Sequence, residues 1–219
     1  MIKAVIFDMD GTILDTLEDL RSSVNYALKI HGFPERSTEE VRQFLGNGMV
    51  KLIERAVPEG TDEDKVQSVL NAHKEYYPLH CTEKTKSYPG IPELLSDLKS
   101  AGIKTAVVSN KTDKNVKTLV NDYFKGLFTV SVGAREGVPR KPAPEMMDIA
   151  LSELGVSKEE ALYIGDSDVD VETARNSGLK MITVLWGFRD KDQLVNAGAD
   201  LFVSDHTELK SLLFSMIDS

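Results

Sequence analysis

The chain has 219 residues, about one and a half times a typical domain of ~150, which predicts one large α/β domain or a domain that carries an insertion. Hydrophobic residues make up 41% and charged residues 28%, values typical of a globular protein with a sizeable core. The net charge of -9 disfavours binding to nucleic acids or to anionic membranes. We therefore expect no nucleic-acid partner and no membrane partner.

Cysteine usage and hydropathy bear on the compartment. The lone cysteine, Cys81, has no partner in the chain for an internal disulfide. No apolar run has the length of a signal-peptide core or approaches the roughly 18 residues of a membrane span. These features predict a cytoplasmic protein.

Short apolar runs rich in β-branched residues have the pattern of buried strands. They cover residues 2–7, 104–109, 128–132, 161–164, 180–184 and 201–203. Segments with helical spacing of apolar residues lie between several of these runs. The alternation predicts the α/β class, with a Rossmann-like parallel sheet whose ligand site lies at the carboxyl ends of the strands.

One long segment breaks this alternation, because residues 16–86 carry no convincing strand. They contain helical patterns at 17–31, 41–45, 49–57 and 64–77. A turn-rich sequence, Ser87-Tyr88-Pro89-Gly90, then marks the return to the alternating pattern. We therefore predict a core domain of residues 1–15 and 87–219 and an inserted, all-helical cap domain of residues 16–86.

Acidic residues follow two of the predicted strands. Asp8 and Asp10 stand two residues apart after the first strand, so their side chains point the same way if the extended backbone continues. Such crowding of like charges is unfavourable unless a cation lies between them. Asp166 and Asp170 follow a later strand, and a site made of oxygen ligands is the kind that Mg²⁺ prefers.

Two further strand ends carry groups that complement these carboxylates. Ser109 and Asn110 offer a hydroxyl and an amide where the second long strand ends. Lys141 stands just before a helix that begins with proline. A lysine among carboxylates reduces their repulsion and can bind a phosphoryl oxygen.

Taken together, these segments resemble the haloacid dehalogenase superfamily over the whole chain. The DMDGT sequence at residues 8–12 matches the family's DxDGT opening, and Ser109 matches its hydroxyl residue after the second core strand. Lys141 lies in the family's KPxP context, and residues 165–170 match its GDSxxD sequence. The predicted helical insertion is similar to the family's small cap.

The resemblance implies a Mg²⁺-dependent phosphatase in which Asp8 attacks phosphorus and forms an aspartyl-phosphate. Asp10 would protonate the leaving oxygen and later deprotonate the attacking water. Asp8, the backbone carbonyl of Asp10, and Asp166 would hold the Mg²⁺ ion. Ser109 and Lys141 would bind the transferring phosphoryl group.

The resemblance also implies supporting roles around these residues. The backbone near Gly11 and Thr12 is expected to contact the substrate, and so is Asn110. Asp170 is expected to orient Lys141 or a metal-bound water. Asp168 has no expected part, because the family pattern uses the first and last acids of residues 166–170.

The cap is the expected source of substrate selectivity, since the core contacts mainly phosphate. Gly46, Asn47 and Gly48 lie between two predicted cap helices and are expected to contact the substrate. Within the superfamily, this sequence and residues 15–20, 183–189 and 197–200 are similar to phosphoglycolate phosphatases. The expected partner is a small phosphorylated metabolite such as 2-phosphoglycolate, and the expected assembly is a monomer or homodimer.

Other functions remain open from the sequence. They include pyrophosphatase, sugar-phosphatase and nucleotidase activities, and a transfer like that of β-phosphoglucomutase, against which the apolar Phe44-Leu45 argues. The non-enzyme alternative is a phospho-acceptor signalling module, which also uses an aspartate, Mg²⁺, a hydroxyl residue and a lysine. Asp10 and the cap favour turnover, because each would serve a leaving group or a substrate that such a module lacks.

Overall fold

The computed structural model describes residues 1–217 and separates into two compact units. One unit, the core, consists of residues 1–14 and the chain from Ser87 onward. The other unit, the cap, consists of residues 15–86. Each unit has its own secondary structure.

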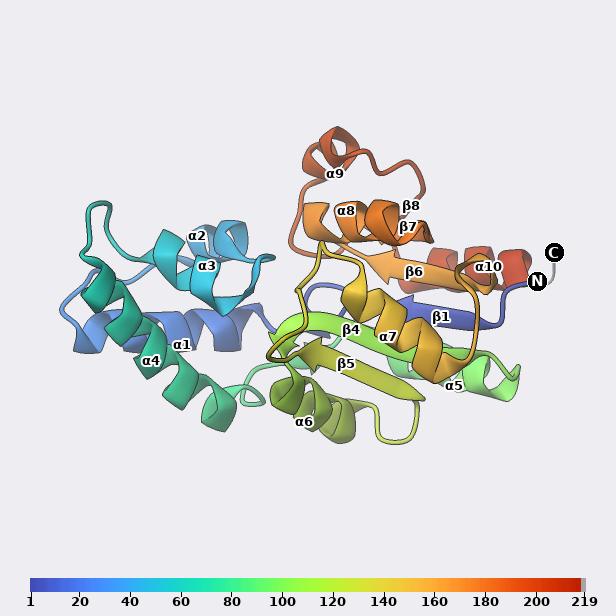
Figure 1. Cartoon of the computed structure of the whole chain (residues 1–219), viewed down its shortest axis with the longest axis horizontal. Helices are drawn as coiled ribbons and strands as arrows, with labels where there is room; N and C mark the ends of the chain where they lie inside the picture. Colours follow the sequence, from blue (N-terminus) through green and yellow to red (C-terminus); the bar gives the residue numbers. More distant parts are fainter. Residues whose placement is uncertain (218–219) are drawn as a thin grey trace. The chain divides into compact units, whose positions relative to one another are not determined.

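The core is built on a parallel sheet of six strands in the order β5-β4-β1-β6-β7-β8 (Figure 1). The strands are β1 (Ala4–Phe7), β4 (Lys104–Thr112), β5 (Val130–Ala134), β6 (Ala161–Gly165), β7 (Lys180–Val184) and β8 (Phe202–Val203). Each corresponds to one of the predicted apolar runs. The predicted α/β fold class with a parallel sheet is therefore confirmed.

Helices flank this sheet and bury it. They are α5 (Ile91–Ser100), α6 (Asp113–Tyr123), α7 (Glu145–Leu154), α8 (Asp168–Ser177), α9 (Lys191–Ala197), α10 (His206–Ile217) and the short 3₁₀ helix η1 (Lys158–Glu160). Figure 1 shows α7 on one face of the sheet, with α5 and α10 on the other. Met146 and Ala150 of α7 pack against Ile6, Val108 and Tyr163 of the strands. Because both faces are covered, β1 is an uninterrupted apolar run rather than an alternating one.

The strand order determines which residues meet at the carboxyl edge of the sheet. β1 lies between β4 and β6, although these three strands are far apart in the chain. Phe7 is level with Val107 on one side and with Ile164 on the other. The residues that follow these three positions therefore emerge at the same edge.

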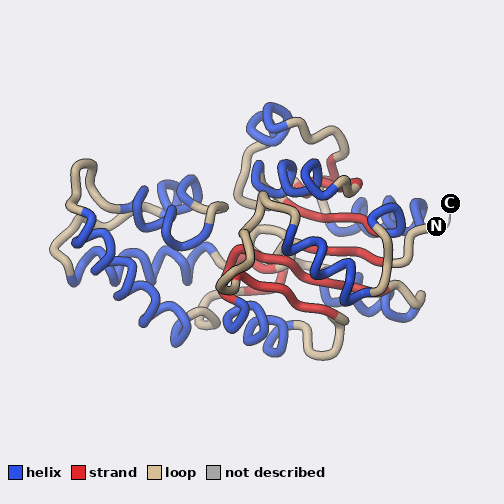
Figure 2. The backbone as a smooth tube through the Cα atoms, viewed as in Figure 1, coloured by secondary structure: helices blue, strands red, loops and turns tan. Residues whose placement is uncertain are grey.

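The cap consists of four helices (Figure 2). They are α1 (Leu17–Ile30), α2 (Thr38–Phe44), α3 (Gly48–Ala56) and α4 (Glu63–His80). Ser37 caps α2 by accepting a hydrogen bond from the backbone of Glu40, whose side chain bonds back to the Ser37 backbone. Val24 and Leu28 of α1 are buried in this unit together with Val69 of α4.

Two short strands that the sequence pattern did not reveal lie where the chain passes between the units. They are β2 (Leu14–Asp15) and β3 (Lys86–Ser87), which pair as a two-stranded sheet. Two residues are too few to show a period of two in hydrophobicity, so the expectation of a segment without strands missed β3 at its end.

Among residues 1–217, no helix combines the length and the apolar character that crossing a membrane requires.

A buried carboxylate holds the end of the cap segment. Asp19, on α1, is 2% exposed, and its oxygens accept hydrogen bonds from the backbone N–H groups of Lys84 at 3.0 Å and Thr85 at 2.8 Å. A buried N–H group without a partner costs about 1–3 kcal/mol. Asp19 therefore fixes residues 84 and 85 against the first cap helix.

We expect the substitution Asp19→Ala to lower the free energy of unfolding by about 2 kcal/mol, because it leaves these N–H groups without their acceptor. Urea titration followed by circular dichroism measures the change. Asp64→Ala, at an exposed position on α4, is the matched control and should change stability by less than about 0.5 kcal/mol. Equal stability of the two variants would contradict the anchoring role of Asp19.

Candidate active site

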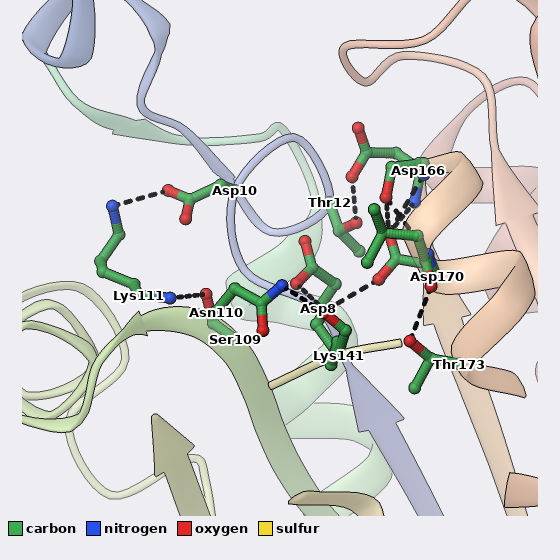
Figure 3. Close-up of polar contacts among 12 residues, drawn as sticks. Asp8, Asp10, Thr12, Ser109, Asn110, Lys111, Lys141, Asp166, Asp170 and Thr173 are labelled. Atoms are coloured by element: carbon green, nitrogen blue, oxygen red, sulfur yellow. Dashed lines mark hydrogen bonds and ion pairs between the residues drawn. The ribbon is translucent and has the colours of Figure 1, made fainter. Parts of the chain in front are cut away.

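Three carboxylates meet at the carboxyl edge of the core sheet (Figure 3). Asp8 directly follows β1, and its backbone N–H donates to the carbonyl of Ile164 on β6 at 2.8 Å. One oxygen from each of Asp8, Asp166 and Asp170 lies within 4.8 Å of the others, and all three residues are buried. The structure therefore brings Asp8 and Asp166 close enough to share one cation.

A buried ammonium group compensates part of this negative charge. Lys141 Nζ lies 2.5 Å from Asp8 Oδ1, 2.8 Å from Asp170 Oδ1 and 2.9 Å from the hydroxyl of Tyr163. These three contacts match the three hydrogens that an ammonium can donate. Lys141 is therefore held in one orientation, with one of its hydrogens on Asp8.

The pKa values of these groups follow from burial and from their mutual charges. Burial raises the pKa of Asp8 well above its usual range; Lys141 opposes this rise, and the carboxylates of Asp170, Asp166 and Asp10 add to it. Burial alone would lower the pKa of Lys141, but the charges of Asp170 and Asp8 outweigh it and raise that pKa. The lysine therefore stays charged, and additional positive charge near Asp8 would stabilise the ionised form of its carboxyl group.

Both oxygens of Asp170 accept hydrogen bonds. Oδ1 accepts from Lys141 and, at 2.5 Å, from the hydroxyl of Tyr163. Oδ2 accepts from the backbone N–H of Asp166 at 3.3 Å and from the N–H and hydroxyl of Ser167 at 3.0 and 2.6 Å. Burial alone would raise the pKa of Asp170, but Lys141 and these hydrogen bonds lower it. Because both oxygens of Asp170 are occupied in this way, Asp170 is better placed to orient Lys141 than to bind a metal ion directly.

Asp166 is fixed from two other parts of the core. Thr12 donates its hydroxyl to Oδ1 at 2.8 Å, and the backbone N–H of Phe188 donates to Oδ2 at 2.8 Å. A Cβ atom at Gly187 would overlap the Asp166 carboxylate, so glycine is required for this close approach. Burial and the charge of Asp170 raise the pKa of Asp166 to about 7.

Asp10 has a different environment from these three acids. Figure 3 shows its carboxylate directed toward Lys111, whose Nζ lies 3.1 Å from Asp10 Oδ1. The Lys111 side chain is only 5% exposed, whereas the Asp10 side chain is 23% exposed. The Asp10 carboxylate therefore belongs to a second ion pair at the same edge of the sheet.

The expected phosphate-binding residues of β4 lie beside this pair. Ser109 is buried, and its hydroxyl oxygen accepts a hydrogen bond from the backbone N–H of Lys111 at 3.2 Å. Asn110 donates its amide to the backbone carbonyl of Lys141 at 2.9 Å, which ties β4 to the lysine segment. Contact of Ser109 and Asn110 with a substrate stays a prediction.

The backbone N–H groups of Gly11 and Thr12, in the turn after β1, form hydrogen bonds within that turn. The N–H of Gly11 donates to Leu14 at 2.9 Å, and the N–H of Thr12 donates to Met9 at 3.3 Å. Gly11 has a φ of 90°, and a Cβ there would also overlap Asp166. Gly11 and Thr12 thus shape the turn and support Asp166, and their contact with a substrate stays a prediction.

The expected substrate loop of the cap joins α2 and α3. Gly46 and Gly48 have φ values of 112° and 83°, and Asn47 accepts a hydrogen bond from Arg55 at 2.8 Å. Two basic residues that flank the loop have partners on their own helices: Arg42 pairs with Glu39, and Lys51 pairs with Glu54. The predicted contact of this loop with a substrate is not tested by these local bonds.

Comparison with known proteins identifies the family of this chain. The model of the haloacid dehalogenase-like hydrolases matches residues 5–184. The chain belongs to this family. The predicted resemblance and the expectation of a hydrolytic enzyme are therefore confirmed.

Individual relatives of this hydrolase cover most of its length. A phosphoglycolate phosphatase of Aquifex aeolicus is 32% identical over 85% of this chain and 86% of its own. An N-acetylmuramic acid 6-phosphate phosphatase of Pseudomonas aeruginosa is 31% identical over 97% and 95%. A crystal structure from Lactobacillus delbrueckii subsp. bulgaricus, provisionally assigned as a phosphoglycolate phosphatase, is 38% identical with a TM-score of 0.92 over 96% and 98%.

Two groups in the site of this hydrolase did not stand out in the sequence. In the sequence, Tyr163 has the pattern of a large residue on a buried strand. That pattern does not indicate the hydrogen bond from its hydroxyl to Asp170. Lys111 is followed by lysines at 114 and 117, a spacing that resembles a solvated helix face, and only the latter two are exposed. β4 continues to Thr112, so Lys111 lies within the last part of a strand and not on the helix that follows.

The donor set fits a divalent cation in this hydrolase. Asp8 and Asp166 lie close together, and burial raises the pKa of both, which means that added positive charge would be stabilising. Carboxylate and carbonyl oxygens are the ligands of a hard ion such as Mg²⁺. The carboxylates of Asp8 and Asp166, with the backbone carbonyl of Asp10, are the candidate ligands.

We expect Asp166→Asn to stabilise the metal-free protein at pH 8 but not at pH 4. The folded-state pKa of Asp166 is about 7, above the usual value of ~3.9 in an unfolded chain, so folding favours the protonated form. Its contribution to stability is present below pH ~4 and is lost as the pH rises toward 7. The melting temperatures of wild type and variant in a chelator, measured from pH 4 to 8, give the comparison.

Added Mg²⁺ provides the control for this measurement. At pH 8 it should raise the melting temperature of the wild type more than that of Asp166→Asn, because the variant lacks one ligand charge. An identical pH dependence of the two proteins would contradict the assignment of a raised pKa to Asp166.

Proposed function

We propose that this hydrolase is a Mg²⁺-dependent phosphatase that hydrolyses small phosphate monoesters through an aspartyl-phosphate. The main support for this proposal is the cluster of Asp8, Asp166 and Asp170 with Lys141 at the carboxyl edge of the sheet. The relatives named as phosphatases support the reaction class. Asp8, directly after β1 and bonded to the lysine, is the nucleophile in this proposal.

The proposed reaction has two displacements at phosphorus. A carboxylate oxygen of Asp8 forms a bond to phosphorus, and the bond from phosphorus to the ester oxygen breaks as Asp10, which is in its protonated form for this step, gives that oxygen a proton. Water then attacks the phosphorus of the aspartyl-phosphate while Asp10 takes a proton from it. Inorganic phosphate leaves, and both carboxyl groups return to their starting states.

The other residues of the site would hold the phosphoryl group and keep it in line. Lys141 and Ser109 bind its oxygens, with Lys141 kept in place by Asp170 and Tyr163. Mg²⁺, when bound, supplies positive charge that neutralises the phosphoryl oxygens and the clustered carboxylates. Asp8, Asp166 and the Asp10 carbonyl would hold that ion.

We propose 2-phosphoglycolate, or a similar small metabolite, as the substrate. Support comes from the names of several relatives, which agree with the resemblance predicted from the sequence around Gly46, Asn47 and Gly48. The relative named as an N-acetylmuramic acid 6-phosphate phosphatase is 31% identical to this chain, close to the 32% of the Aquifex aeolicus phosphoglycolate phosphatase, so a direct assay must distinguish the substrates. A Mg²⁺-dependent screen of 2-phosphoglycolate, sugar phosphates, nucleotides and pyrophosphate would rank them, and equal weak rates on all would contradict the proposed selectivity.

Replacing the nucleophile is expected to abolish turnover. Asp8→Asn should lower kcat by at least ~10³-fold on any monoester that the wild type hydrolyses, because the amide cannot form the phosphoenzyme. Asp168→Asn is the matched control, since Asp168 has a side chain 47% exposed and pairs with Arg189 outside the cluster. Full activity of Asp8→Asn, with intact mass spectrometry showing no deamidation, would remove Asp8 as nucleophile.

Replacing the acid and base is expected to slow both displacements without removing the nucleophile. Asp10→Asn should reduce kcat by ~10² to ~10⁴-fold, the usual contribution of a positioned acid or base. The reduction should be smaller with p-nitrophenyl phosphate, whose leaving group needs no proton, and phosphorylated enzyme should then accumulate. Intact mass spectrometry detects this species, and an equal loss with both classes of leaving group would contradict the role.

A further inference from the structure

Lys111 is a buried charged group that the proposed phosphoryl transfer does not use. Its side chain is 5% exposed, and its Nζ lies 3.1 Å from Asp10 Oδ1. Burying an ammonium is costly unless anionic or polar partners surround it. A buried lysine at the edge of the candidate active site therefore calls for a counter-charge in every state of the reaction.

The position of Lys111 relative to Ser109 indicates which part of a substrate it would meet. Both residues belong to the last part of β4, next to β1 in the sheet. Ser109, with Lys141, is on the side that would hold the phosphoryl group. Figure 3 shows Lys111 beside Asp10, away from the cluster of Asp8, Lys141 and Asp170. Since Asp10 contacts the ester oxygen in the proposed reaction, Lys111 lies on the side of the leaving group.

The reaction would also change the surroundings of Lys111. Asp10 must direct its carboxyl group to the ester oxygen when that oxygen departs, and this weakens its pairing with Lys111. An anionic substituent on the leaving group could then take the place of the Asp10 carboxylate. A carboxylate that is separated from the ester oxygen by a single carbon would lie next to the Asp10 carboxyl group, and Asp10 is itself 3.1 Å from Lys111 Nζ.

We propose that Lys111 binds an anionic substituent on the leaving group, a carboxylate one carbon from the ester oxygen, and so selects short phosphorylated acids. This inference rests on the proposed function and deepens it, since it assigns the substrate class to a residue of the core. A charge-assisted hydrogen bond of this kind contributes enough for a 10- to 100-fold preference.

The test compares 2-phosphoglycolate with its neutral carboxamide analogue, phosphoglycolamide, which has nearly the same shape. For each protein the measured quantity is the ratio of kcat/KM for the acid to kcat/KM for the amide. We expect a ratio of at least about 10 in the wild type, a fall of about 10- to 100-fold in Lys111→Met, and partial retention in Lys111→Arg. Lys114→Met, at an exposed position on α6, should keep the wild-type ratio.

The outcomes separate the two proposals. Loss of activity in Lys111→Met by the same factor on both substrates would overturn the inference and leave Lys111 without a role in choosing the leaving group. Equal wild-type kcat/KM on acid and amide would overturn it as well, even if the Lys111 variants fail to fold. A wild type that hydrolyses neither these substrates nor any other monoester would instead contradict the proposed function itself.

Discussion

The core of this hydrolase depends on one electrostatic constraint: three buried carboxylates share a small volume with one buried lysine. Their nearest oxygens lie within 4.8 Å of one another, and Lys141 contacts two of them. Like charges at such separations destabilise a fold unless every oxygen has donors or cations around it. The donors of Asp170 and Asp166 come from separate segments, so these hydrogen bonds form only when the core is folded.

The glycines around the cluster follow from the same constraint. Any side chain at Gly11 or Gly187 would occupy the space of the Asp166 carboxylate, and one at Gly165 would overlap Asp170. Trp186, next to Gly187, donates its indole N–H to the backbone of Thr12 at 3.1 Å and so links the two segments that bind Asp166. The loop after β7 thus acts as a support for an acid that follows β6.

The sequence was sufficient for the parts of the molecule that depend on periodicity. Six apolar runs became the six strands, and the helical patterns of the cap became α1 to α4 within a few residues. The convergence of Asp8 with Asp166 was predictable too, since parallel strands place their carboxyl ends at one edge. The roles of Tyr163 and Phe188 could not be predicted from the sequence. The Tyr163 hydroxyl donates to Asp170 and the Phe188 N–H donates to Asp166, and no periodicity in the sequence encodes such contacts between separate elements.

The two buried lysines of the candidate active site, Lys141 and Lys111, would in the proposed reaction serve two ends of one substrate from the same edge of the sheet. Lys141 is oriented by Asp170 and Tyr163, and its third hydrogen, now on Asp8, would pass to a phosphoryl oxygen when Asp8 acts as the nucleophile. Lys111 pairs with Asp10, a more exposed carboxylate that would change partners in the proposed reaction. Because β4 carries both Ser109 and Lys111, phosphate binding and leaving-group selection would be coupled through one strand. Selectivity for an acidic leaving group would then reside partly in the core, apart from any contribution of the cap.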